Sequence, residues 1–210
     1  MRPINEWYYF TSAIDKKTCN KIKAIGNNDF KAGHVDTKKD VTEEDRINGV
    51  EKEYALSKKS RDSEVSWTSE QWIIELVWPY MMEANEQSGW NFNVTAVEGM
   101  QITRYKPGSF YGWHVDGGGD CLSAYNNPDS KFLHGKVRKL SMTILLNGNY
   151  QGGDFQFVQY NKLKNKVATP DFKNAGSVIV FPSFMEHQVV PVTKGTRYSL
   201  VAWFVGPPFK

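Results

Sequence analysis

The sequence predicts a mainly β protein with flanking α-helices, on three observations. Runs of β-type composition follow one another closely from about residue 97, turn residues such as Asn147-Gly148 separate them, and two helix-type segments precede them. Closely spaced short strands with turns between them are typical of β-sandwiches and jelly rolls. We therefore expect one domain over residues 1–210, with helical support over about 1–95 and a β core over about 96–206.

Two segments before the β region predict helices. Residues 12–26 place Ser12 and Asp15 at capping and first-turn positions, repeat apolar residues at roughly helical intervals and end on Gly26. Residues 69–87 also have a helical pattern, and Pro79 is expected to kink or divide that helix. The stretch 27–66 is polar and lysine-rich with little periodicity, so irregular chain is expected there.

The β region divides into seven candidate strands and one long excursion. The strands are 97–105, 110–116, 138–147, 154–160, 176–182, 187–192 and 196–206. Between the second and third, residues 117–137 form a polar excursion beside His114 and Asp116. Because long loops tend to be either functional or disordered, the excursion is a lid that selects the substrate or an unconstrained insertion.

Charge and cysteine content exclude some classes of protein. Lysines and arginines number 26 and acidic residues 23, a formal charge of +3, which is too weak to predict nucleic acid or membrane as a partner. Two distant cysteines, Cys19 and Cys121, form no disulfide framework and no zinc knuckle. Without an apolar signal after Met1 or a run long enough to cross a bilayer, we expect a cytoplasmic location.

His114 and Asp116 are candidate metal ligands, because residues i and i+2 of a strand project from the same face. His187 is the candidate third ligand, since it begins a β-type run that a jelly roll could bring beside them. His34 and His134 are expected to be exposed. Two imidazoles and one carboxylate form the facial triad of non-haem Fe(II) oxygenases. Taken alone, His187 would be a strand-end histidine bonded to backbone or water.

Arg197 lies ten residues after His187 and is a candidate anion-binding residue. Its planar guanidinium could hold the far carboxylate of a dicarboxylic co-substrate through paired hydrogen bonds, and Ser199 on the same strand face could add a donor. The alternative is an outer-strand arginine in a surface ion pair. Strand alternation leaves open which face of 196–206 is inside.

The chain resembles the 2-oxoglutarate and Fe(II)-dependent dioxygenases of the prolyl 4-hydroxylase-like group. Over about residues 97–205, the resemblance rests on Tyr-x-x-Gly-x-Phe (105–110), His-x-Asp (114–116), KLSMTILLN (139–147), GGDF (152–155), GSVIVFPS (176–183) and EHQVVPVTKGTRYSLVAW (186–203). It implies a double-stranded β-helix (jelly roll) core, with Fe(II) held by His114, Asp116 and His187. It also implies 2-oxoglutarate as co-substrate on Arg197, with ascorbate as reductant.

Three further residues are candidates for the co-substrate pocket. By the resemblance, Tyr105 assists the far carboxylate and Trp203 forms an aromatic wall; each could instead be an ordinary core residue. Thr143 is proposed on strand alternation alone.

The resemblance implies a 2-oxoglutarate-dependent hydroxylase that inserts oxygen into an unactivated C–H bond and releases succinate and CO2. Prolyl residues of a protein are the nearest substrate, and a free amino acid or other small molecule is the alternative. Because Asp116 is present, halogenation is not expected, and Trp203 stands where nucleobase demethylases carry a second arginine. The rival from another class is a non-enzymatic metal-binding jelly roll that senses a ligand, which would not need Arg197. The oligomeric state is left open.

Overall fold

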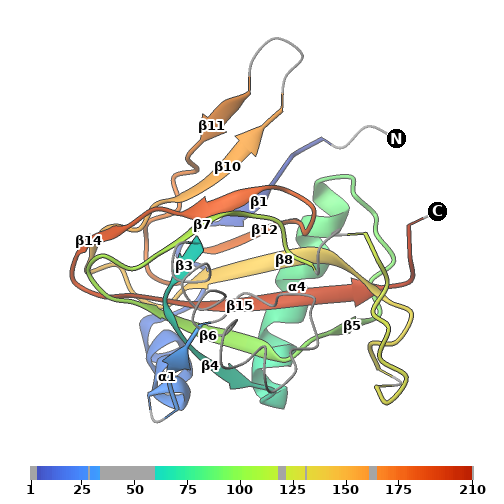
Figure 1. The fold of residues 1–210 in the computed structure, drawn as a ribbon, viewed down its shortest axis with the longest axis horizontal. Coiled ribbons are helices and arrows are strands. Elements are labelled where there is room, and N and C mark those ends of the chain that lie inside the picture. Colours follow the sequence, from blue (N-terminus) through green and yellow to red (C-terminus); the bar gives the residue numbers. More distant parts are fainter. Residues whose placement is uncertain are drawn as a thin grey trace, which may run out of the picture.

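The computed structural model describes residues 4–27, 29–33, 60–117, 122–130, 132–160 and 165–209 (Figure 1). His34, which was expected to be exposed, and Cys121 lie outside these ranges. The helices are α1 (Lys16–Gly26) and α4 (Gln71–Gln87). The strands are β1 (Tyr8–Phe10), β2 (Lys31–Ala32), β3 (Arg61–Asp62), β4 (Glu64–Thr68), β5 (Ala96–Val97), β6 (Met100–Tyr105), β7 (Phe110–His114), β8 (Val137–Leu145), β9 (Gln151–Gly152), β10 (Phe155–Gln159), β11 (Lys166–Ala168), β12 (Val178–Pro182), β13 (His187–Val189), β14 (Val192–Lys194) and β15 (Arg197–Gly206).

The strands form two principal sheets and a short ribbon. The larger sheet has the order β1-β12-β8-β15-β6-β4-β2, and β5 pairs with β15. The smaller sheet has the order β11-β10-β13-β7-β3, and β14 pairs with β9. Neighbouring strands run antiparallel in both principal sheets, and the predicted jelly-roll core is confirmed.

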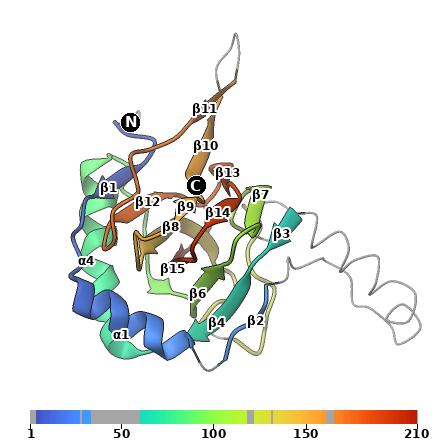
Figure 2. The same cartoon turned by 90° about the vertical axis from the view of Figure 1, so that its left-hand side faces the viewer.

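The molecule is layered, with α1 and α4 on one face of the larger sheet and the smaller sheet on the other (Figure 2). Strand β15 illustrates why both faces are covered. Its Leu200, Ala202 and Phe204 are buried in the core beneath the helices, together with Ile22 of α1 and Val77 of α4. Its alternate residues face the smaller sheet, where a second core of mainly aromatic side chains fills the space beside the candidate site.

The prediction of irregular chain over 27–66 is wrong for the residues that the structure describes, because β2, β3 and part of β4 lie in that stretch. Strand β4 pairs with β6 along its whole length and buries Val65, Ser66 and Thr68. The inward face of β4 carries hydroxyl side chains, so the strand shows no alternation of apolar and polar residues. For this reason its sequence did not predict a strand. The support before residue 95 is therefore partly β.

Both helices differ in detail from the prediction. Helix α1 begins after Asp15 rather than near Ser12, because the Asp15 carboxylate caps it by accepting from the backbone N–H groups of Lys17 (2.8 Å) and Thr18 (3.0 Å). Helix α4 continues undivided through Pro79. Pro79 and Glu75 are both exposed, so water can bond the Glu75 carbonyl that the proline leaves without a donor.

Within the described ranges, neither helix combines the length and the apolar character needed to cross a membrane.

Candidate metal and co-substrate site

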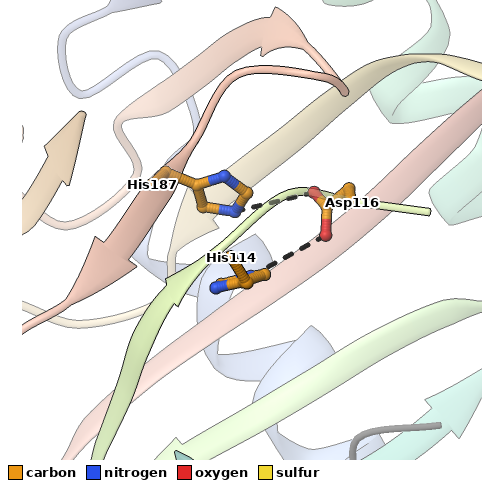
Figure 3. Close-up of side chains that lie close together, drawn as sticks. All are labelled: His114, Asp116 and His187. Carbon is orange, nitrogen blue, oxygen red and sulfur yellow. Dashed lines mark ion pairs between the residues drawn. The ribbon is translucent and has the colours of Figure 1, made fainter. Parts of the chain in front are cut away.

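His114, Asp116 and His187 come together where two neighbouring strands meet (Figure 3). Strands β7 and β13 pair with His187 directly opposite His114, and Asp116 follows β7 by two residues. The Nε2 atoms of His114 and His187 lie 3.9 and 3.6 Å from the two carboxylate oxygens of Asp116. Because metal bonds to these ligands are about 2.1 Å long, atoms sharing one ion lie up to about 4.2 Å apart, so both distances fit a single ion.

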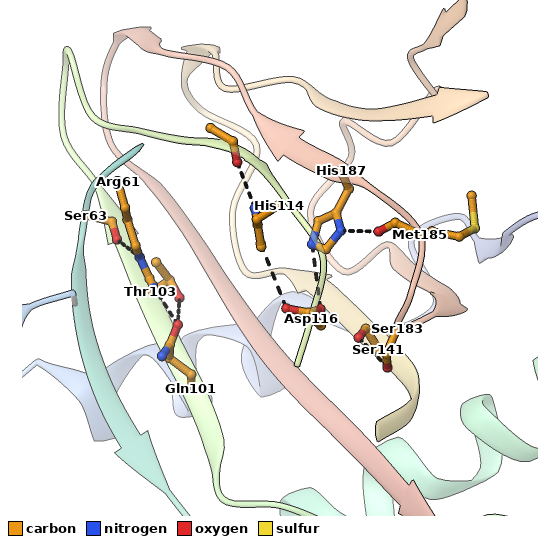
Figure 4. A network of polar contacts seen from close by, with 11 residues as sticks. Arg61, Ser63, Gln101, Thr103, His114, Asp116, Ser141, Ser183, Met185 and His187 are labelled. Carbon is orange, nitrogen blue, oxygen red and sulfur yellow. Dashed lines mark hydrogen bonds and ion pairs between the residues drawn. The ribbon is translucent and has the colours of Figure 1, made fainter. Parts of the chain in front are cut away.

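Each histidine presents the same ring nitrogen to Asp116. The Nδ1 of His114 lies 2.8 Å from the carbonyl oxygen of Gly112, and that of His187 lies 2.9 Å from the carbonyl oxygen of Met185 (Figure 4). A carbonyl can only accept, so each Nδ1 donates its proton and each neutral ring leaves a lone pair on Nε2. Two lone pairs facing a carboxylate repel one another unless a cation lies between them. The donor set therefore fits a divalent metal.

The protonation states agree with a ligand set. Burial, followed by the proximity of His187, lowers the pKa of His114 to about 3, so its ring is neutral near pH 7. Burial acts to raise the pKa of Asp116, but His187, His114 and Arg138 together hold that pKa below its usual value. Neutral imidazole and ionised carboxylate are the forms that bind metal.

Two serines support the turn that carries Asp116. The backbone N–H of Asp116 donates to the carbonyl oxygen of Ser183 at 2.9 Å, and the hydroxyls of Ser183 and Ser141 are also 2.9 Å apart. Both serines are fully buried. The position of the carboxylate is thus fixed from behind by strands β8 and β12.

Arg197 lies deep in the same cavity and is 1% exposed. Its Nη1 donates to Ser199 Oγ at 3.0 Å, and its guanidinium lies 5.2 Å from the ring centre of Tyr105. Within the described ranges its Nε and Nη2 atoms have no hydrogen-bond partner and no carboxylate forms an ion pair with it. A buried cation with two free donors is costly until an anion binds it, so Arg197 fits a carboxylate ligand.

Every residue predicted for the site lines one cavity. The predicted members are His114, Asp116, His187, Arg197, Tyr105, Ser199, Trp203 and Thr143. The surface ion pair considered for Arg197 is excluded by its burial, and the face of β15 that carries Arg197 and Trp203 is the one facing the cavity. His134 is exposed, as expected.

The prediction missed six residues of the cavity wall. They are Arg61, Gln101, Thr103, Tyr111, Phe155 and Val189. Val201 also lines the cavity, on the strand face that it shares with Arg197 and Ser199. Gln101 and Thr103 lie on the same face of β6 as Tyr105, so strand parity could have found them. Arg61 left no such signal, because it lies in a stretch without periodicity.

Tyr111 contributes a flat neutral wall to this cavity. Its ring stacks on that of His114 with centres 3.5 Å apart, and burial raises its pKa to about 12.

One residue of the excursion, Tyr125, is linked to the cavity through Glu98 and Arg138. The hydroxyl of Tyr125 donates to Glu98 at 3.0 Å, and Arg138 donates two hydrogen bonds of 2.8 Å to the same carboxylate. The Arg138 guanidinium also lies 4.3 Å from the ring centre of Trp203, a cavity residue. Residues 118–121 and 131 are outside the described ranges, and the role of 117–137 as a lid stays a prediction.

Comparison with known protein families gives a match over the β region. The sequence model of the 2OG-Fe(II) oxygenase superfamily matches residues 100–205. A PKHD-type hydroxylase of Synechococcus sp. (strain CC9902) is 36% identical over 114 residues, 52% of this chain and 42% of that protein. A PKHD-type hydroxylase of Alteromonas mediterranea is 35% identical over 105 residues, 49% of this chain and 41% of that protein. The aligned part is thus less than half of each relative.

Solved structures share the fold at low sequence identity. A viral collagen prolyl hydroxylase from Paramecium bursaria Chlorella virus-1, solved with 2-oxoglutarate, aligns with a TM-score of 0.59 and 17% identity over 96% of this chain and 97% of that chain. A prolyl hydroxylase from Trichoplax adhaerens aligns with a TM-score of 0.62 and 17% identity over 95% and 83% of the two chains. These alignments extend the agreement in fold to the elements before residue 95.

Proposed function

The chain belongs to the 2OG-Fe(II) oxygenase superfamily, and on that basis we propose that it is a 2-oxoglutarate-dependent hydroxylase acting on an unactivated C–H bond. The observation that carries the proposal is the buried Arg197 guanidinium, in the cavity that holds the His114, Asp116 and His187 cluster. Two of its nitrogens have no hydrogen-bond partner among the described residues. A site that only binds metal has no use for such a cation.

The three clustered residues would hold Fe(II), and Arg197 would hold the far carboxylate of 2-oxoglutarate. Iron and 2-oxoglutarate, once bound, would let molecular oxygen act as the oxidant: one oxygen atom would enter the succinate formed from 2-oxoglutarate with release of CO2, and the other would enter the substrate C–H bond. The chain positions these groups. Backbone carbonyls fix both imidazole rings, and Ser199 fixes one nitrogen of the guanidinium.

The rest of the cavity wall would orient the ligands and exclude water. The Tyr105 ring lies beside the Arg197 guanidinium, which supports the proposal that its phenol assists the same carboxylate. Thr143 and Trp203 line the cavity from β8 and β15. Phe155 stacks on His187 with ring centres 5.4 Å apart, which keeps that side of the metal site dry.

We propose prolyl residues of a protein as the substrate. The support is that both similar structures described above are named prolyl hydroxylases. A free amino acid or other small molecule is the alternative. The cytoplasmic location and the absence of nucleic acid and membrane as partners stay predictions.

The test is succinate formation from 2-oxoglutarate by the purified protein with Fe(II) and ascorbate. Wild type should form succinate, His187→Ala should not because it removes a metal ligand, and His134→Ala should match wild type because that histidine is exposed. In parallel, 2-oxoglutarate added to the Fe(II) protein without oxygen should give the weak visible band of a chelate. A protein that binds Fe(II) but gives neither succinate nor the band is a ligand sensor, and the hydroxylase proposal would be wrong.

A further inference from the structure

A second buried arginine, Arg61, lines the same cavity. It begins β3, which pairs with β7 so that Arg61 lies opposite Tyr111, and it is 6% exposed. Figure 4 shows its side chain reaching Gln101 and Thr103 of β6, in the same view as the His–Asp–His cluster. The side chain thus crosses from the smaller sheet to the larger one along the cavity wall.

The Arg61 guanidinium is held in place by neutral groups. Its Nε donates to Ser63 Oγ and its Nη2 to Gln101 Oε1, both at 2.7 Å, and its Cζ lies 4.5 Å from the ring centre of Tyr111. A side chain at Gly33 would come within 2.9 Å of Nε, so this glycine leaves room for the guanidinium. These contacts fix the orientation of the cation without neutralising its charge.

Among the described residues no carboxylate forms an ion pair with Arg61. Bound 2-oxoglutarate would not neutralise Arg61 either. On β6, Gln101 is four residues from Tyr105, which pairs with Arg197. Four residues of strand span about 13 Å. A five-carbon co-substrate with one end on Arg197 and the other at the metal leaves the Arg61 end of the cavity empty.

With Fe(II) and 2-oxoglutarate bound, the charges in the cavity would sum to one net positive charge. The lining residues contribute two arginine cations and one aspartate anion, with the histidines neutral as ligands. Divalent iron adds two positive charges and 2-oxoglutarate adds two negative ones. The remaining charge resides on Arg61, where burial makes an unpaired cation costly.

We propose that Arg61 binds a carboxylate of the substrate, so that the enzyme hydroxylates a molecule carrying an anionic group close to its reacting carbon. This inference rests on the proposed function. It favours a free amino acid, or a peptide with an acidic residue beside the target, over a neutral prolyl segment. Arg61 would act as a specificity-determining residue, while the chemistry stays with the metal and 2-oxoglutarate.

The test uses protein loaded with Mn(II), which is paramagnetic and does not turn over, and saturated with 2-oxoglutarate so that Arg197 is occupied. Acetate is the probe and neutral acetamide its control, and the relaxation of their methyl protons is measured against concentration. Acetate should relax saturably near the metal and acetamide should not. Arg61→Gln should weaken acetate binding at least about tenfold, as expected for a lost buried charge pair, and Arg61→Lys should retain part of it.

Several outcomes separate this inference from the proposed function. A protein that fails to bind Mn(II) or 2-oxoglutarate contradicts the proposed function before any probe is added. Equal relaxation of acetate and acetamide in the loaded wild type, which needs no variant, would overturn the role of Arg61, and so would equal acetate binding in a folded Arg61→Gln. Relaxation of free L-proline assigns the carboxylate to an amino acid, and that of acetyl-aspartyl-prolinamide assigns it to a peptide side chain.

Discussion

Arg197 and Arg61 are two buried cations in one cavity, and their neighbours assign them different roles. Among the described residues Arg197 makes one hydrogen bond and keeps two free donor nitrogens, so it can donate to both oxygens of a carboxylate. Arg61 has two of its nitrogens bonded to Ser63 and Gln101, so fewer donors remain. The first is suited to two-point binding of a co-substrate and the second to a single contact with a substrate.

Arg197→Gln should therefore weaken 2-oxoglutarate binding by at least about 30-fold, the equivalent of about 2 kcal/mol for a lost charge-assisted contact. Metal affinity should be unchanged, because Arg197 contacts none of the three ligands. Titration of the Mn(II) protein with 2-oxoglutarate by calorimetry measures the first quantity. The matched control is Arg104→Gln on neighbouring β6, which removes an outer ion pair with Glu64. Equal losses in the two variants would show that Arg197 does not bind the co-substrate.

At the scale of elements, a turn outside β15 helps to position the Arg197 side chain. Gly153, which follows β9, has φ +64°, and a Cβ there would come within 3.0 Å of Arg197 Cδ and of Val192 Cγ2. Gly108, between β6 and β7, also has positive φ, at +89°, but no atom lies within 4 Å of the place of its Cβ. The two glycines share a backbone demand, and only one touches the site.

Gly153→Ala should lose both stability and 2-oxoglutarate affinity, whereas Gly108→Ala should lose stability alone. Each alanine incurs a left-handed backbone cost of about 1 kcal/mol. In Gly153→Ala the new methyl also displaces the Arg197 side chain. Thermal unfolding and 2-oxoglutarate titration of both variants distinguish the effects. If Gly153→Ala binds 2-oxoglutarate as tightly as Gly108→Ala, the turn does not position the guanidinium.

The sequence predicted those elements whose residues alternate clearly. Strand β15 alternates Leu200 and Ala202 against Arg197 and Ser199, so the members of each face were known. Only the packing of α1 and α4 shows which of the two faces lines the cavity. Strand β3 was missed because it has two residues and depends on pairing with β7. The same pairing places Arg61 in the cavity, so a residue that long-range contacts position left no local pattern.

At the scale of the whole molecule, the two cores differ in character, and the site lies beside the one between the sheets. Beneath α1 and α4 the larger sheet packs mostly aliphatic side chains, whereas between the sheets the buried side chains are largely aromatic, including Phe157 and Phe181. The cavity occupies the part of the inter-sheet space where polar residues replace these rings. The sequence could predict which residues bind metal and co-substrate. It could not predict the depth of the cavity, because that depends on how the two sheets face one another.

Ligands that bind between the sheets should stabilise the whole fold in two separable steps. A ligand at 100 times its dissociation constant adds about 2.7 kcal/mol, and for a chain of this size each kcal/mol raises Tm by about 2–4 °C. Mn(II) should therefore raise Tm by about 5–10 °C, and 2-oxoglutarate should add a similar step only when metal is present, because its near end needs the metal. Differential scanning calorimetry of the unloaded, Mn(II) and doubly loaded protein measures both steps. His187→Ala should lose both, and Arg197→Gln only the second. A 2-oxoglutarate step of full size without metal would mean that the co-substrate binds elsewhere in the molecule.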